Sequence, residues 1–378
     1  MDQEKLMSEP IDDWNQQVPA LPEELFDAPA PVISVYLTTA GARPDAAEHV
    51  ALRWKTLRRR LADDGAPESA LAEVDPLMER AHADGETLVA IASAAGLLYV
   101  ANLPDLPEQD LAVVGPLPHL VPLLAETQRM IPHIVVAIDR IGAELVAVLP
   151  AEPDLHAEVT GRDLHITRSA PGGWSQRRFQ QRAENRWEAN AREVADELTR
   201  LVDATAPRLV VVTGDVRAVA FLREHVPARV SSLLSEVQGD YSGLDEALRR
   251  SADMATALVE EETAALLADY ERERGQDDLS SVGPSETLEA LARGQVETVL
   301  LDPSRTVAHT AWFGPELAQV ASCPEDLERA GVVHPTEAPL DDVLIRAAVA
   351  TAARVRITPP GVAQLAPSGV GGLLRYRL

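Results

Sequence analysis

The chain has 378 residues, 46% of them hydrophobic and 25% charged, which is the composition of a globular protein and excludes a disordered one. This length predicts two or three domains. The formal net charge of −26 argues against indiscriminate nucleic-acid binding, because an acidic surface repels phosphate, although it also fits a simple solubility device.

The first residues, MDQEKLMSEPIDDWNQQ, have neither the basic start nor the apolar stretch of a signal peptide. No apolar run reaches the roughly 20 residues of a membrane-spanning helix. These features predict a cytoplasmic protein without membrane contact. Cys323 is the single cysteine, so an internal disulfide framework is excluded, and the scattered histidines predict neither a metal site nor a cofactor.

In chain order, PVISVYLTT (31–39) is typical of a strand and is followed by two predicted helices over 45–63 and 67–83. TLVAIAS and GLLYVANL predict two more strands. The proline-rich residues 113–124 predict an extended connector, which ends a first α/β domain at about residue 130.

A second domain begins with two strands over 133–150, followed by a strand pair over 154–169. After a Gly-Gly loop and a long helix, residues 208–226 predict a buried strand, a Gly-Asp turn with Asp215 as turn residue or N-cap, and a helix. A further helix over about 244–274 follows. In the third domain, Ser285 is the expected N-cap of a helix that leads into the strand VETVLLD.

The predicted fold class is therefore α/β, with three consecutive domains. Their expected bounds are 1–130, 131–278 and 279–378. A long amphipathic helix belongs to the middle domain, because apolar residues recur there at spacings of three and four. These residues are Phe179, Ala183, Trp187, Ala191, Val194, Leu198 and Leu201.

Basic residues gather in two segments of this acidic chain. RWKTLRRR (53–60) holds five basic residues and no acidic one, and six arginines lie between 168 and 192 against two glutamates. A helix over the first segment is expected to have Leu52, Thr56 and Leu57 on one side, with the arginines Arg53, Arg58 and Arg60 around the other. Either segment is consistent with a solvated helix face or with contact to a polyanion.

The segment at the start of the long helix resembles the middle domain of archaeal and eukaryotic class-I peptide release factors and Pelota. Those release factors have Gly-Gly-Gln, then Ser and an Arg-Phe pair; this chain has Gly172-Gly173-Trp174, Ser175 and Arg178-Phe179. LEALARGQVETVLLD and the ending GVGGLLRY are similar to the last domain of that superfamily. The resemblance covers residues 130–378 and implies its three-domain arrangement, with the domains placed toward the decoding centre, the peptidyl-transferase centre and a GTPase partner.

Tryptophan replaces the glutamine that positions water in a release factor, and an indole cannot supply an amide's donor and acceptor. The decoding motifs of release factors are also missing from residues 1–130. The similarity is therefore greatest to the bacterial branch and to the Balon-like hibernation factors of mycobacteria. It implies a non-enzymatic factor, monomeric off the ribosome, that occupies the A site of the 70S ribosome with elongation factor Tu and protects it during stress and dormancy.

The resemblance implies two sets of rRNA-binding residues and no catalytic residue. On the 23S, peptidyl-transferase side the set is Gly172, Gly173, Trp174, Ser175, Arg177, Arg178 and Arg182. On the 16S, decoding side it is Arg53, Lys55, Arg58, Arg59 and Arg60. Two alternatives stay open: a peptidyl-tRNA or RNA hydrolase that uses Gln176 or an acidic cluster, and an acidic adaptor that binds a protein partner.

Overall fold

The computed structural model describes the backbone of residues 23–39, 46–80, 87–103, 110–149, 154–160, 173–237, 244–276, 279–365 and 367–376. The chain divides into two compact units. The middle unit contains residues 129–261, and a discontinuous unit combines residues 1–128 with residues 262–378. Sheets and helices occur in both units, which confirms the predicted α/β class.

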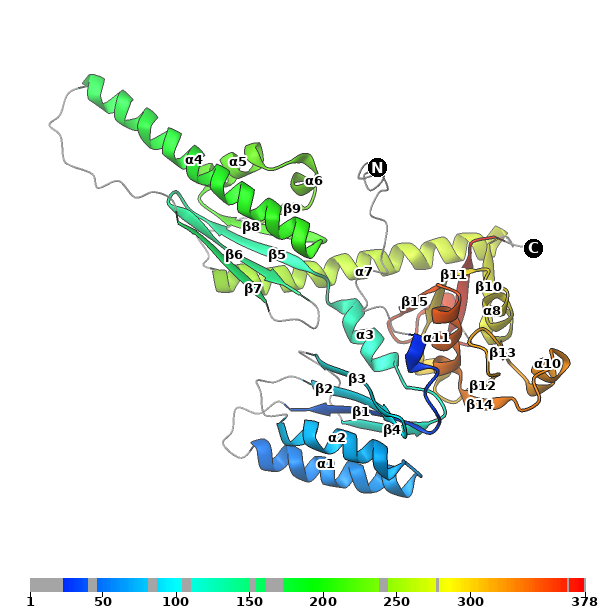
Figure 1. Cartoon of the computed structure of the whole chain (residues 1–378). Helices are drawn as coiled ribbons and strands as arrows, with labels where there is room; N and C mark the ends of the chain where they lie inside the picture. Colours follow the sequence, from blue (N-terminus) through cyan, green and yellow to red (C-terminus); the bar gives the residue numbers. More distant parts are fainter. Residues whose placement is uncertain are drawn as a thin grey trace, which may run out of the picture. The chain divides into compact units, whose positions relative to one another are not determined.

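The discontinuous unit begins with an antiparallel sheet of order β3-β2-β1-β4. Its strands are β1 (Val32–Thr38), β2 (Thr87–Ser93), β3 (Gly96–Leu103) and β4 (Leu111–Gly115). A short 3₁₀ helix (Glu23–Leu25) precedes them, and α1 (Ala46–Asp63) and α2 (Glu68–Arg80) lie side by side against one face of the sheet (Figure 1). Ile33, Val35 and Leu37 of β1 are buried toward these helices, because alternate side chains of a strand point to the same face.

The C-terminal part of the same unit has two sheets. In the larger, of order β10-β16-β11-β15, β11 and β15 are parallel; the smaller has the order β13-β12-β14. The strands are β10 (Ser280–Val282), β11 (Val296–Leu301), β12 (Thr310–Phe313), β13 (Val320–Ala321), β14 (Thr336–Pro339), β15 (Arg354–Ile357) and β16 (Val370–Leu374). The helices are α8 (Gly283–Ala292), α9 (Pro303–Thr306), α10 (Pro324–Arg329), α11 (Leu340–Ala350) and a 3₁₀ turn (Ala363–Leu365).

A common hydrophobic core joins the two parts of this unit. It includes Val89 and Ile91 of β2, Leu124 of α3 (Val121–Arg129), and Leu344 of α11. The prediction of an extended connector over 113–124 is wrong, because β4 and α3 occupy most of it. Pro122 lies in the first turn of α3, where a proline costs no hydrogen bond and its fixed φ suits a helix.

The middle unit is built on a five-stranded sheet of order β7-β6-β5-β8-β9, in which β5, β8 and β9 are parallel. The strands are β5 (His133–Ile138), β6 (Gly142–Val148), β7 (Leu155–Thr160), β8 (Leu209–Gly214) and β9 (Leu234–Glu236). The helices are α4 (Gly173–Thr205), α5 (Val216–His225), α6 (Ala228–Ser231) and the first part of α7 (Leu244–Gln276).

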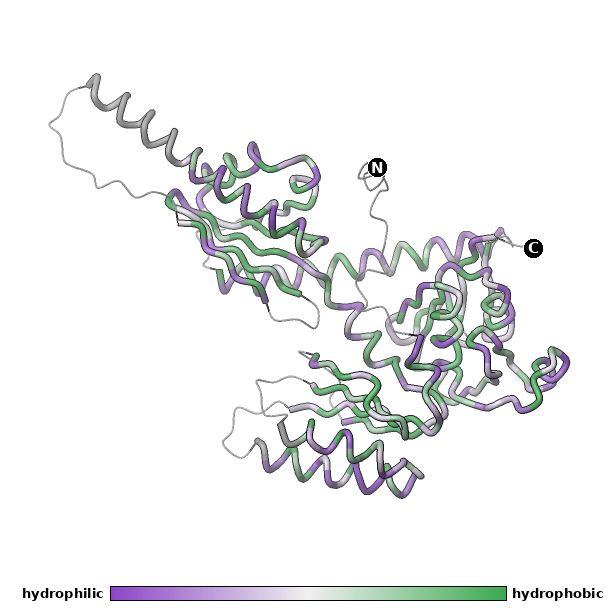
Figure 2. Tube along the Cα trace, in the orientation of Figure 1, coloured by the Kyte–Doolittle hydropathy of each residue, from purple (hydrophilic) through white to green (hydrophobic). Residues whose placement is uncertain are grey.

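Both faces of this sheet are covered. Ile134, Val136 and Ile138 of β5 pack with α4 and α5, whereas Val135 packs with α7. Strands β5 and β8 are accordingly apolar along most of their length, while α1 in the other unit carries many hydrophilic residues (Figure 2). A strand buried on both faces reads as a continuous apolar run, as HIVVAI and RLVVVT do.

Helix α8 begins earlier than the sequence predicts. Ser285 is not the N-cap of its helix: α8 begins at Gly283 with Val282 as its N-cap residue. The Glu286 carboxylate accepts a hydrogen bond from the Val282 N–H at 2.9 Å, so a glutamate of the first turn, rather than a serine hydroxyl, satisfies this helix end. The division into three domains at residues 130 and 278 stays a prediction.

Candidate functional site

Helix α4 carries the motif that the sequence singles out. It runs from Gly173 to Thr205, so the helix begins inside the Gly-Gly-Trp motif rather than after a separate loop. Of the predicted apolar seam, Ala191, Val194 and Leu198 are buried against the sheet, as expected. The seam therefore fixes the C-terminal half of α4 to the middle unit.

The predicted peptidyl-transferase-side residues lie in the first turns of this helix. The backbone is helical at Gly173, Trp174, Ser175, Arg177, Arg178 and Arg182, and Gly172 lies outside the described residues. Their role in binding rRNA stays a prediction. What the structure adds is that the six helical positions form the start of one continuous element.

A cluster of four side chains connects α4 to the carboxyl ends of β5 and β8. The guanidinium of Arg140 lies over the ring of Trp187 on α4, 4.6 Å from its centroid, and donates to the Asp215 carboxylate at 2.9 Å. Asp215 is the N-cap of α5, as the sequence predicts, and accepts from the N–H groups of Arg217 and Ala218. We call Arg140, Trp187, Asn190 and Asp215 the helix clamp.

The clamp is also tied to the turn between β5 and β6. The Asn190 amide donates to the carbonyl oxygens of Arg140 and Ile141, at 3.0 and 3.2 Å. Burial opposes ionisation of Asp215, but the hydrogen bonds from Arg140 and from the start of α5 outweigh it and lower the pKa of this carboxyl. Asp215 is therefore ionised at neutral pH and remains paired with Arg140.

Gly214 lets these groups come together. It has a φ of +135°, and a Cβ at this position would lie 1.8 Å from the Ile138 carbonyl oxygen of the neighbouring parallel strand. Only glycine permits both the positive φ and the close approach. The Asp215 N–H then donates to that same carbonyl at 3.0 Å, which extends the pairing of β5 and β8 by one residue.

Helix α1 carries the predicted decoding-side residues, but its basic side chains differ in what they contact. Arg53 donates to both oxygens of the Asp110 carboxylate, at 2.8 and 2.9 Å. Arg58 is paired with Asp75 of α2 at 3.0 Å and with Glu68 at 2.5 Å. These two arginines therefore hold the first sheet and helix α2 in place, which fits a structural role better than a role in binding.

The remaining basic residues of α1 are exposed. Lys55 and Arg59 have no ion pair with any residue that the structure describes, and Arg60 makes a long contact of 3.8 Å with Asp64. Leu52 was expected on the apolar side of α1, but 63% of it is exposed. The buried side is instead formed by Val50, Trp54 and Leu61, one helical face at spacings of four and seven. Lys55, with Arg59 one turn further on, is thus on the open side.

A buried polar network links the two parts of the discontinuous unit, and the sequence interpretation missed it. The ring Nδ1 of His119 lies 2.9 Å from Asp342 Oδ1 on α11, although 223 residues separate them in the chain. The main chain of His119 is bound by β1, through Ser34 Oγ at 2.9 Å and the Tyr36 hydroxyl at 2.6 Å. Nothing in the local sequence pairs these groups, and the adjacent carboxylates Asp341 and Asp342 in PLDDVLIRAAVA are the one available signal.

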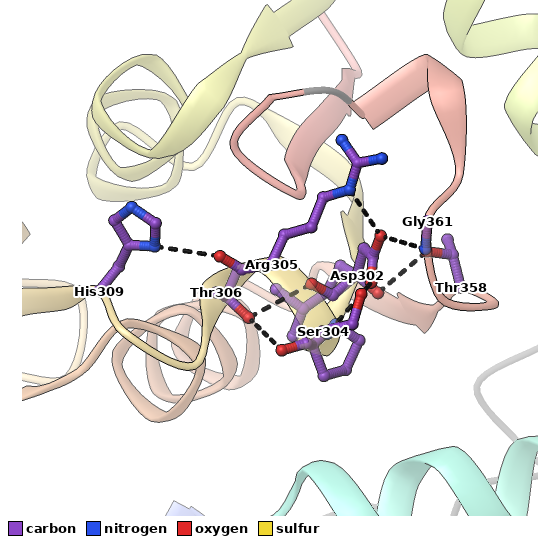
Figure 3. Close-up of polar contacts among 9 residues, drawn as sticks. Asp302, Ser304, Arg305, Thr306, His309, Thr358 and Gly361 are labelled. Carbon is purple, nitrogen blue, oxygen red and sulfur yellow. Dashed lines mark hydrogen bonds and ion pairs between the residues drawn. The ribbon is translucent and has the colours of Figure 1, made fainter.

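Neighbouring donors occupy the acceptor positions of a second buried carboxylate, Asp302. Asp302, 0% exposed, follows β11 and accepts hydrogen bonds from the Ser304 hydroxyl at 2.6 Å and the Gly361 N–H at 2.8 Å. The Arg305 Nε lies 3.2 Å from the same carboxylate (Figure 3). Because these donors belong to α9 and to the loop after β15, Asp302 joins these two segments and has no free acceptor for a ligand.

No group of three or more His, Cys, Asp or Glu side chains among the described residues could hold a metal ion. The described helices include none long and apolar enough to cross a membrane. Carboxylates gather in α7, in LVEEETAALLADYERE (258–273), and some are engaged with arginine: Asp269 and Glu273 both lie within ion-pair distance of Arg272. This pairing is typical of a solvated helix face.

The middle segment matches a described protein family. Residues 132–279, which contain α4 and the helix clamp, match the family model "Bacterial archaeo-eukaryotic release factor family 2". This match supports the resemblance of the segment to the bacterial branch of the release-factor and Pelota superfamily that the sequence predicts. The match covers the Gly-Gly-Trp motif.

The chain is similar over nearly its full length to an uncharacterized protein of Mycobacterium tuberculosis, Rv2629. The two are 28% identical over 366 residues, 93% of this chain and 95% of the relative. MT2704, from a second strain of that species, matches equally. The relatives thus share the N-terminal part of the chain as well as the family segment.

Solved structures of the superfamily are also similar. A model of ribosome-bound archaeal Pelota and ABCE1 is 13% identical, covers 95% of each chain and gives a TM-score of 0.38. The archaeal translation termination factor aRF1 is 16% identical, with 94% and 96% covered and a TM-score of 0.24. For Dom34 of Saccharomyces cerevisiae the identity is 10%, the coverage 80% and 82%, and the TM-score 0.37.

Proposed function

We propose that this protein is a ribosome-binding factor of the cytoplasm that occupies the A site without hydrolysing peptidyl-tRNA, and that it acts in hibernation or stress protection as Balon-like factors do. The family model that matches residues 132–279 supports a ribosome-associated translation factor as the general function. The observation that carries the finer proposal is Gly172-Gly173-Trp174 in that segment, where a release factor has Gly-Gly-Gln.

The chemistry of Trp174 supports binding rather than hydrolysis. An indole offers one N–H donor and no acceptor, so it cannot orient water as an amide does. An aromatic ring stacks on unpaired bases, which contributes about 1–3 kcal/mol per base. Arg177, Arg178 and Arg182 would add contacts to 23S rRNA, because a guanidinium forks onto phosphates and stacks on bases.

The position of the helix clamp is consistent with an N-terminal part of α4 that extends beyond the sheet. Trp187 and Asn190 hold α4 at the carboxyl edge of the sheet, and the helix continues from there to Gly173. At 1.5 Å per residue, this continuation is about 20 Å long. A rigid helix is a means of presenting a short motif at a distance from the body that carries it.

On the decoding side, Lys55 and Arg59 are the residues of α1 that we propose for contact with 16S rRNA, with Arg60 beside them. The other two members of the predicted set, Arg53 and Arg58, support this surface through Asp110 and Asp75. We further propose delivery by a translational GTPase, elongation factor Tu in a bacterium, and a monomer off the ribosome. The acidic remainder of the chain would limit non-specific RNA binding.

Cosedimentation of the purified protein with vacant 70S ribosomes over a salt series tests this function, with and without elongation factor Tu and guanine nucleotide. We expect binding near one copy per ribosome that weakens with salt. Absence of binding under every condition would overturn the proposal and favour an adaptor that binds a protein partner.

A second assay separates binding from catalysis. Ribosomes stalled with a labelled peptidyl-tRNA are incubated with the protein, and the released peptide is counted. We expect no release above buffer. Release that depends on Gln176 would instead establish the hydrolase alternative.

A further inference from the structure

The contact between the first sheet and the C-terminal part of the discontinuous unit contains ionisable groups. His119, in the segment between β4 and α3, is bound through its main chain to Ser34 and Tyr36 of β1 and through its ring to Asp342 of α11. The Asp342 side chain is 3% exposed and that of His119 22%. One residue therefore connects a strand of the first sheet with a helix of the C-terminal part.

A second carboxylate lies beside this contact. Asp341, adjacent to Asp342 at the start of α11, is 6% exposed, and its Oδ1 has no hydrogen-bond partner among the described residues. A buried oxygen without a donor disfavours the ionised carboxylate, because the charge loses its water and the interaction with Thr306 offsets only part of that loss. A proton on Asp341 removes that charge and its repulsion of Asp342.

We propose that His119, Asp341 and Asp342 form a proton-dependent latch, which holds the first sheet against α11 and weakens when the cluster loses protons. The other groups that face it are Thr306 and His309 beside Asp341, and the Tyr36 hydroxyl, which binds the His119 carbonyl. The latch goes beyond the proposed function, since it concerns the packing within one unit and can be tested without ribosomes.

The direction of the proton dependence follows from the surroundings of each group. Burial, together with the charge of Asp342, outweighs the opposing effects of Thr306, His119 and His309 and raises the pKa of Asp341 from its ordinary 3.8 to about 6. Burial also raises the pKa of Asp342, against the effect of His119. For His119, burial opposes protonation, but the hydrogen bond to Asp342 and the charges of both aspartates outweigh it and raise the pKa.

The packed state therefore binds more protons than a state in which these groups are in water. Its stability falls as pH rises wherever this excess exists. For Asp341 the loss runs from about pH 4 to about pH 6, between its free and packed pKa values. For His119 the stabilisation is complete below its free pKa of 6.5 and is lost as pH rises through the higher packed value. Both groups act in the same direction.

Hydrogen–deuterium exchange of the full chain measures this directly. Protection factors, corrected for the intrinsic effect of pH on exchange, would be compared at about pH 5 and about pH 8 for peptides around His119 and α11. We expect local opening to increase by about tenfold or more, because about one pH unit of the Asp341 range lies above pH 5, which corresponds to about tenfold, and His119 adds to it. Peptides of α5, in the middle unit, serve as the internal reference.

Two variants distinguish the latch from general alkaline loosening. Asp341→Asn keeps the shape of the side chain without a charge, so we expect protection at about pH 8 to exceed that of the wild type and the pH dependence to be smaller. Asp326→Asn, at an exposed carboxylate of α10, should behave as the wild type. If Asp341→Asn retains the full wild-type pH dependence, or if the wild type shows none at these peptides, the latch is wrong.

Discussion

The guanidinium of Arg140 lies between the ring of Trp187, 4.6 Å from its centroid, and the carboxylate of Asp215, at 2.9 Å. Arg140 follows β5, Trp187 belongs to α4 and Asp215 begins α5, so one side chain holds three elements at the edge of the middle sheet. From this point α4 runs on to the Gly-Gly-Trp motif. The clamp thus connects the carboxyl ends of β5 and β8 with the part of the chain that we propose to contact the ribosome.

Removing the guanidinium of Arg140 should destabilise the contacts at the carboxyl ends of β5 and β8. We expect Arg140→Ala to lower the free energy of unfolding by about 1–2 kcal/mol, because a cation–π contact and a hydrogen-bonded ion pair are both lost, while the half-exposed position of Arg140 limits each. Urea titration measures the change, and hydrogen exchange should locate it at the β5–β6 turn and the start of α5.

The matched control is Arg192→Ala, also on α4. Arg192 is exposed and lies 3.9 Å from Glu188, so its removal should change the free energy of unfolding by less than about 0.5 kcal/mol. Equal effects of the two variants would mean that the clamp adds nothing beyond an ordinary surface ion pair.

Helix α9 and the loop after β15 should depend on Asp302. Asp302→Ala removes the acceptor for Ser304, Arg305 and Gly361 and leaves their donors without a partner in a buried place. We expect the free energy of unfolding to fall by about 3–5 kcal/mol, as for a broken buried pair. Asp302→Asn keeps one acceptor oxygen but turns its N–H₂ group toward other donors, so it should lower the free energy of unfolding by clearly less.

Thermal unfolding compares the two Asp302 variants, with Asp326→Asn as the exposed control. If Asp302→Ala lowered the stability less than Asp302→Asn, this carboxylate would not be the shared acceptor of α9 and the loop after β15.

Secondary structure with a strong local pattern follows from the sequence, and structure that depends on distant partners does not. The strands TLVAIAS and GLLYVANL were predicted with the bounds that they have, because both are apolar and separated by a tight turn. Residues 113–124 were not, since three prolines hide a strand that is stabilised by pairing with β1 and a helix that tolerates proline in its first turn.

The same distinction applies to the candidate site. The Gly-Gly-Trp motif and Asp215 as N-cap are local features, and the sequence is enough to find them. The contact of His119 with Asp342 and the pairing of Arg53 with Asp110 arise only when distant segments meet. For that reason the sequence treats all five basic residues of 53–60 alike, whereas the structure divides them into paired and open ones.

This division makes a prediction about α1. Lys55→Ala with Arg59→Ala should weaken ribosome binding and reduce the slope of log affinity against log salt by roughly two, because each cation that contacts a phosphate contributes about one unit. The stability of the protein should change little, since both side chains are exposed. Cosedimentation over a salt series provides both numbers.

Arg58→Ala is the contrasting variant of the same helix. It leaves Asp75 and Glu68 of α2 without their shared partner, so we expect a loss of stability of about 1 kcal/mol and an unchanged salt slope. A reduced slope for Arg58→Ala, with a normal slope for the Lys55 and Arg59 variant, would show that the exposed face of α1 does not meet RNA.

Trp174 is the residue that distinguishes the motif of this chain from that of a release factor. If Trp174 occupies the place of the glutamine, Trp174→Gln recreates Gly-Gly-Gln at the start of α4. An amide there can accept from and donate to water at the peptidyl-tRNA ester, so we expect peptide release from stalled ribosomes to exceed that of the wild type by about tenfold or more. The control is Trp174→Ala, which removes the bulk of the indole without providing an amide and should release no peptide. Release by both variants would show that tryptophan only blocks access of water. If both variants bind ribosomes and neither releases peptide, the tip does not reach the ester, and the placement of α4 in the peptidyl-transferase centre would have to be abandoned while ribosome binding itself stands.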